Sequence, residues 1–152
     1  MSSSNYTYRA AEILVNAQKI CEDNQHAQFT PLHILAAMTP TEGKDGESIY
    51  LKALIERCRL DWQSFTRIVN KHLVRLPSIT GSNLSAPLSD SICDVLINLD
   101  KIKGQQKDTS IGQDHILLSL LEDSSIKTIM KEAGVNIETL KAQVVKLKGF
   151  TR

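Results

Sequence analysis

One motif occurs twice in this chain. The segment TPLHILAAM at residues 30–38 returns as GQDHILLSLLED at residues 112–123, so that His33 and His115 are 82 positions apart. Ahead of each motif, the same offset of 82 also aligns four pairs of identical residues. These pairs are Leu14 with Leu96, Asn16 with Asn98, Lys19 with Lys101 and Ile20 with Ile102. After a loop at residues 39–48 the offset falls to 75, because the segment LDW at 60–62 aligns with VNI at 135–137. The sequence therefore predicts a tandem repeat, which strongly constrains the fold.

Apolar residues recur at intervals of three and four in both halves, the spacing that places them on one face of an α-helix. We expect four helices in each half, near residues 8–21, 30–38, 49–58, 61–73, 92–102, 113–121, 126–134 and 136–147. The predicted fold class is all-α, with eight helices arranged as a tandem repeat of two four-helix units related by a pseudo-two-fold axis.

The connection between the halves is the longest irregular stretch, since residues 76–89 contain two prolines, a glycine and five serines or threonines. We predict a single domain over residues 1–152, with repeat one at 1–75, a linker at 76–89 and repeat two at 90–149. A repeat of about 70 residues buries little apolar surface by itself, so the two repeats should pack on each other.

Composition argues against several classes of function. With 18 basic and 17 acidic residues the net charge is +1, so no overall field favours nucleic acid or an anionic membrane. The sequence opens without a basic segment followed by an apolar run, and no run of about 18 apolar residues occurs, so we expect neither export nor a membrane span. The cysteines are odd in number and widely spaced, which favours reduced thiols at Cys21, Cys58 and Cys93.

Motifs for catalysis and cofactor binding are absent from the sequence. Gly43 and Lys44 are followed by Asp45, which does not fit a phosphate-binding loop, so this chain should neither bind nor hydrolyse ATP. The histidines are not spaced along the sequence like the ligands of a metal site; they are His26, His33, His72 and His115. His33 and His115, near the third position of equivalent helices, are better explained as structural residues that link a helix start to its neighbour. We predict no metal, no cofactor and no enzymatic activity for this chain.

The repeated motifs also carry a family resemblance. TPLHILAAM and GQDHILLSLLED, each preceded by an amphipathic helix and separated by a Pro/Ser linker, resemble the double repeat in the N-terminal domain of Clp-family AAA+ chaperones. Further segments resemble the fungal cytosolic ClpB-type heat-shock disaggregases: QFTPLHILAAM, NKHLVRLP, KGQQKD, GQDHILLSLLEDSSI and LKGFTR.

This resemblance implies an all-α domain that binds unfolded or aggregated polypeptides and modulates a hexameric, two-ring motor that uses ATP and Mg²⁺. DnaK-type co-chaperones and the ATPase rings themselves are the other partners that it implies. We expect the isolated domain to be monomeric, to act in the cytoplasm or also in the nucleus, and to have no nucleic-acid or membrane partner.

The resemblance also places a client-binding groove. Carried over by alignment, its interior falls on Leu96, Asn98, Ile102, Ile111, His115 and Leu118. Its polar rim falls on Thr7, Asp108 and Asp114, whose carboxylates would contact peptide N–H groups or basic side chains. Asn98 and His115 stand where related domains often carry an aliphatic residue, so this groove should be more polar than theirs.

Two functions fit these features. The hydrophobic-peptide site of a chaperone should bind many denatured proteins weakly, at micromolar or lower affinity, through an apolar groove with few hydrogen bonds. A docking module for one folded adaptor or co-chaperone should instead bind a single partner on a polar-rimmed patch, without general affinity for unfolded chains.

Overall fold

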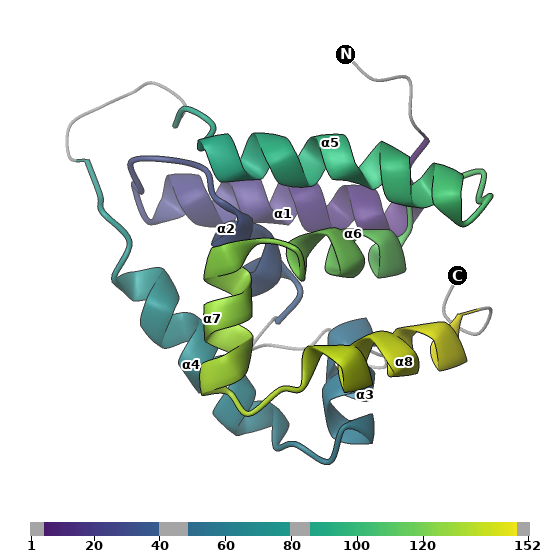
Figure 1. The fold of residues 1–152 in the computed structure, drawn as a ribbon. Coiled ribbons are helices and arrows are strands. Elements are labelled where there is room, and N and C mark those ends of the chain that lie inside the picture. The colour runs from purple at the N-terminus through teal and green to yellow at the C-terminus, as the bar shows by residue number, and fades with distance from the viewer. Residues whose placement is uncertain (1–4, 40–48, 80–85, 149–152) are drawn as a thin grey trace.

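The structure is a computed structural model that describes residues 5–39, 49–79 and 86–148. Over these residues the chain is all-α, as predicted, and its elements are eight helices (Figure 1). Their bounds are α1 Tyr8–Asp23, α2 Pro31–Ala37, α3 Tyr50–Arg57, α4 Trp62–Val74, α5 Asp90–Gln105, α6 Gln113–Leu120, α7 Ser124–Glu132 and α8 Ile137–Leu147. Within the described part of the chain, no helix combines the length and the apolar character needed to cross a membrane.

The helices repeat at the spacing found in the sequence. Helices α1 and α5 each contain 16 residues and begin 82 positions apart. The two turns that follow them each contain a residue in the left-handed region, Gln25 with φ 53° and Lys107 with φ 58°. The second halves agree at the offset of 75, where Arg59 with φ 63° aligns with Gly134 with φ 79°. The backbone therefore confirms the tandem repeat down to its unusual torsion angles.

Each repeat begins at a hydroxyl cap. Thr7 Oγ1 accepts a hydrogen bond from the Ala10 N–H at 3.2 Å at the start of α1. Ser89 Oγ accepts one from the Ile92 N–H at 3.1 Å at the start of α5. Such caps satisfy an N–H group that has no partner inside the helix, and they fix where the helix begins.

The two repeats pack by reciprocal contacts. Within the repeats α1 packs on α2, and α5 packs on α6; between them, α1 contacts α6 while α5 contacts α2. Helix α3 likewise contacts α8, and α7 contacts α4. Exchanging the two repeats turns the α1–α6 contact into the α5–α2 contact, and the α3–α8 contact into the α7–α4 contact. A pseudo-two-fold axis produces this pattern. The buried side chains of both repeats form one continuous core.

Polar contacts reinforce the cross-repeat pairs. Arg57 Nε on α3 donates to Gln143 Oε1 on α8 at 2.8 Å. On the reciprocal side, His72 Nε2 of α4 lies 2.8 Å from Glu132 Oε1 of α7, and the Lys71 ammonium group also bonds to this carboxylate. These hydrogen bonds from Lys71 and His72 hold the pKa of the Glu132 carboxyl below its ordinary value.

The linker is attached to repeat one at both ends. Backbone hydrogen bonds of 2.8 Å to 3.0 Å join residues 77–79 to residues 25–27, and residues 87–89 to Phe29. Residues 80–85, and most of the predicted loop at 39–48, lie outside the described residues. The described parts of the connection are irregular, as predicted, but their backbone is paired.

Candidate client-binding site

The structure separates the predicted site residues into two places. Thr7, Asp108, Ile111, Asp114 and His115 lie together where the start of the chain meets the loop between α5 and α6. The remaining four lie along the helices: Leu96, Asn98 and Ile102 on α5, and Leu118 on α6.

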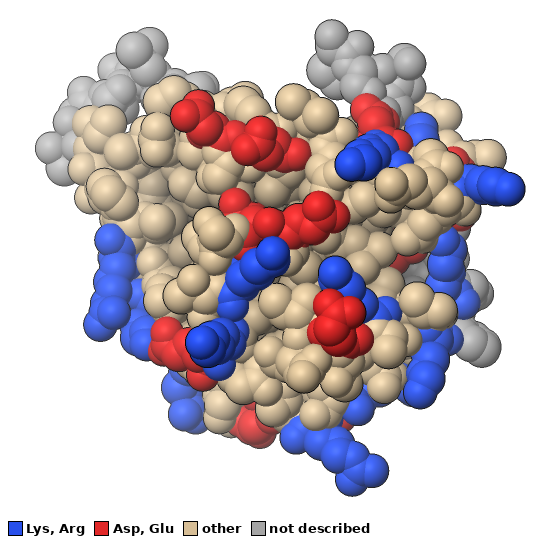
Figure 2. Space-filling view, viewed as in Figure 1, with Lys and Arg blue, Asp and Glu red and all other residues tan. Residues whose placement is uncertain are grey.

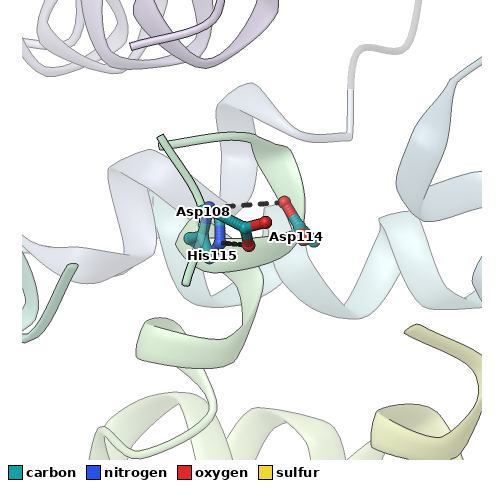
Figure 3. A group of neighbouring side chains, drawn as sticks. All are labelled: Asp108, Asp114 and His115. Carbon is teal, nitrogen blue, oxygen red and sulfur yellow. Dashed lines mark hydrogen bonds and ion pairs between the residues drawn. The ribbon is translucent and has the colours of Figure 1, made fainter. Parts of the chain in front are cut away.

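The first place is a hydrogen-bonded cluster centred on His115 (Figure 3). His115 Nδ1 accepts a hydrogen bond from the Gly112 N–H at 2.8 Å, so the neutral ring carries its proton on Nε2. Nε2 lies 2.7 Å from Asp108 Oδ2, to which it donates. Lys148, just after α8, donates to the same oxygen at 2.8 Å and also bonds to Gln106. The cluster therefore ties the end of α5 to the start of α6 and to the end of α8.

Burial leaves these cluster residues little surface for a ligand. The exposed fraction is 0% for His115, 1% for Ile111 and 5% for Asp114. Ile111 is also held by backbone pairing, since its carbonyl accepts from the Thr7 N–H at 2.9 Å. On α5, Ile102 is 6% exposed. His115, Ile111, Asp114 and Ile102 therefore lie below the surface. Leu96, Asn98 and Leu118 are half-buried and reach the surface.

The cluster also brings together potential metal ligands. One oxygen of Asp108, one of Asp114 and a ring nitrogen of His115 lie within 4.8 Å of one another. Both ring nitrogens of His115 are already used, however, by the Gly112 N–H and by Asp108. The Lys148 ammonium group places a positive charge against Asp108. Asp108 Oδ2 and both ring nitrogens of His115 therefore already take part in hydrogen bonds within the protein.

Repeat one contains the matching histidine with a different partner. His33 Nδ1 accepts from the Thr30 N–H at 2.9 Å, and His33 Nε2 lies 2.7 Å from His26 Nδ1. His26 occupies the position that aligns with Asp108. Burial, together with the neighbouring His26, lowers the pKa of His33 from 6.5 to about 4. These contacts confirm the structural role predicted for the two aligned histidines.

The structure also contains an open groove, which lies between α5 and the turn that joins α6 to α7. Its volume is 710 Å³, and Figure 2 shows acidic side chains gathered over these elements. It is lined by Asp90, Ser91, Asp94, Val95, Ile97, Asn98, Lys101, Ser119, Glu122, Asp123 and Ser124. Ser119 Oγ donates to the Val95 carbonyl at 2.7 Å, which joins α6 to α5 at the groove. Asn98 is the one predicted groove residue in this lining.

Ile97 gives the groove an apolar side chain that reaches solvent. It is 73% exposed, among the most exposed of the large hydrophobic residues that the structure describes. Sequence analysis did not single it out, although it falls outside the buried stripe of α5 formed by Ile92, Val95, Leu99 and Ile102. An aliphatic residue out of phase with the core face was the signal that could have indicated it.

Known proteins are similar to this chain in sequence and in fold. The chain is 31% identical to Heat shock protein 104 of Schizosaccharomyces pombe over 152 residues, which cover 100% of this chain and 17% of that protein. It is 33% identical to Heat shock protein hsp98 of Neurospora crassa over 144 residues, covering 88% of this chain and 16% of that protein. The chain thus spans less than a fifth of the length of these curated relatives.

A solved structure agrees with this relationship. The crystal structure of the Hsp104 N-terminal domain from Candida albicans superposes with a TM-score of 0.87 at 44% identity, covering 98% of this chain and 95% of that one. Residues 5–133 match the family described as Clp repeat (R) N-terminal domain. The chain therefore belongs to the Clp N-terminal domain family, in which it is similar to the fungal Hsp104-type heat-shock chaperones.

Proposed function

We propose that this chain is the client-binding N-terminal domain of an ATP-dependent protein disaggregase. Unfolded or aggregated polypeptide would bind in the groove between α5 and the α6–α7 turn. The names of the relatives, which are heat-shock proteins, support the chaperone class. ATP hydrolysis, Mg²⁺ binding and hexamer formation would belong to other parts of a longer protein, acting in the cytoplasm.

The observation that carries this proposal is the exposed Ile97 beside an open groove of 710 Å³. Burying an aliphatic side chain completely contributes about 1.5–3 kcal/mol, and a client segment can cover Ile97 from the groove side. Ordering a flexible chain opposes that gain, so affinity should be on the order of micromolar or weaker. Weak binding of this kind suits a domain that must release its clients to a motor.

A docking module for a folded adaptor is the second candidate. Polar and charged side chains make up most of the groove lining, and a polar rim is also typical of specific protein interfaces. This alternative differs in its ligand, since the chain would then bind one folded partner and show no affinity for unfolded polypeptide.

Substitution of Ile97 tests the groove. Ile97→Glu should weaken binding of a fluorescently labelled, reduced and permanently unfolded protein about five- to tenfold, because the apolar contact with Ile97 is lost. Val145→Glu is the matched control, since Val145 on α8 is 72% exposed and does not line the groove. Fluorescence anisotropy measures both, after circular dichroism has shown each variant to be folded.

Equal affinity of the parent and both variants would place the client site elsewhere. A parent chain that binds no unfolded protein, but is retained by one folded partner, would favour the adaptor-docking function instead.

A further inference from the structure

The groove between α5 and the α6–α7 turn is far more acidic than the chain as a whole. Its lining carries four carboxylates, from Asp90, Asp94, Glu122 and Asp123, and one ammonium group, from Lys101. The formal charge of the lining is therefore −3, against +1 for the whole chain. Figure 2 shows acidic side chains on α5 and around the turn beneath it, facing each other across this surface.

Three of these carboxylates are available to a ligand. Asp123 is used as the cap of α7, where it accepts from the Ile126 N–H at 3.1 Å. Asp90, Asp94 and Glu122 are exposed, and within the described part of the chain their side chains take part in no hydrogen bond or ion pair. They are therefore free to meet a cation that enters the groove.

The internal repeat provides a comparison for Asp94. At the offset of 82 its counterpart is Glu12 on α1, whose carboxylate lies 3.9 Å from the guanidinium group of Arg9. The position that aligns with Arg9 is occupied by Ser91 in repeat two. The same helical position thus has a basic neighbour in repeat one and none in repeat two. Asp94 therefore contributes negative charge to the groove without the basic neighbour that its counterpart Glu12 has.

We infer that this groove selects polypeptide segments in which lysine or arginine stands next to aliphatic side chains, and that it disfavours acidic segments. The inference rests on the proposed client-binding function and names the class of segment that this site takes. An aliphatic side chain of the client covers Ile97, while its basic neighbours lie against Asp90, Asp94 and Glu122. Exposed ion pairs contribute about 0.2–1 kcal/mol each, so the charges mainly determine which segments bind and how fast they associate.

Three short, unstructured peptides test this preference on the full 152-residue chain. They share the same leucine and serine positions and carry lysine, glutamine or glutamate at the others. At low salt the lysine peptide should bind about five- to tenfold more tightly than the glutamine peptide, and the glutamate peptide should bind most weakly. Raising the ionic strength to about 0.5 M should reduce these differences, because the charges are exposed and become screened.

Charge reversal in the groove should reverse the order. The double variant Asp94→Lys/Glu122→Lys should prefer the glutamate peptide. The control Asp23→Lys/Glu56→Lys makes the same change in net charge at two exposed positions outside the groove, and it should keep the parent's order. Circular dichroism establishes that both variants are folded before the titrations.

The outcomes separate this inference from the proposed function. Equal binding of the three peptides to the parent, or an unchanged order in the folded groove variant, would overturn the charge preference and leave client binding in place. Failure of every peptide to bind the parent would overturn both.

Discussion

The two aligned histidines, His33 and His115, accept the same kind of backbone hydrogen bond but donate to different partners. In each, a backbone N–H group occupies Nδ1, so the ring proton lies on Nε2 and must find an acceptor there. His115 donates to the carboxylate of Asp108, whereas His33 donates to the ring of His26. Adding a proton to His33 Nδ1 would break its hydrogen bond with the Thr30 N–H. It would also place a positive charge beside the His26 ring.

The free energy of unfolding should therefore fall as the pH falls through the range set by His33. Its pKa is near 6.5 when unfolded and about 4 when folded, so between these values the unfolded chain binds more protons. This contribution is fully present above pH 6.5 and is lost as the pH falls towards 4, at up to about 1.4 kcal/mol per pH unit.

Urea denaturation at a series of pH values measures this effect. His33→Gln keeps a side-chain acceptor near the Thr30 N–H but removes the titrating ring, so its stability should depend less steeply on pH. Because acidic residues titrate in both proteins, the difference between the two slopes is the informative quantity. Identical slopes would show that His33 contributes nothing to the acid sensitivity.

At the scale of elements, the linker at residues 76–89 is irregular, as its sequence predicted, but its backbone is paired in a way that the sequence did not predict. Prolines and a glycine predicted an irregular connection, and the described parts of residues 76–89 are irregular. Their backbone pairing with residues 25–29 could not be predicted, because backbone hydrogen bonds between two irregular segments leave no periodic pattern of side chains. Helix positions were predictable for the opposite reason, since burial on one face imposes a spacing of three and four.

Shortening the linker should therefore destabilise the domain. Deleting Ser78 and Ile79 removes a backbone bond between Ile79 and Gln25 and shifts the neighbouring pairing, which should lower the free energy of unfolding by about 2 kcal/mol or more. The control deletes Glu42 and Gly43, in the loop for which repeat two has no counterpart, and should cost much less. Chemical denaturation compares the two deletions, and equal losses would contradict a structural role for the linker.

At the scale of the whole molecule, the two repeats are packed into one core. The contacts of α3 with α8 and of α4 with α7 cross between repeats, and a single cluster of buried residues includes side chains from both. Sequence self-similarity predicted two units that pack on each other. It did not indicate which helices cross, because that depends on the relative placement of the units rather than on the pattern within either one.

The same limit explains why the predicted groove residues divide as they do. Alignment identified a region of repeat two, and Asn98 does line the groove. It could not separate the surface from the layer beneath, so His115 and Ile111 were included although they are 0% and 1% exposed. The acidic groove itself depends on the approach of α5 to the α6–α7 turn, which brings together residues about 30 positions apart in sequence.

The central claim is that unfolded polypeptide binds between α5 and the α6–α7 turn. The most direct measurement is an NMR titration of the ¹⁵N-labelled chain with a reduced, permanently unfolded protein. We predict that the amide signals that shift will cluster at residues 90–101 and 119–124, with little change along α8. Shifts confined to other surfaces, or no shifts at concentrations well above micromolar, would contradict this account.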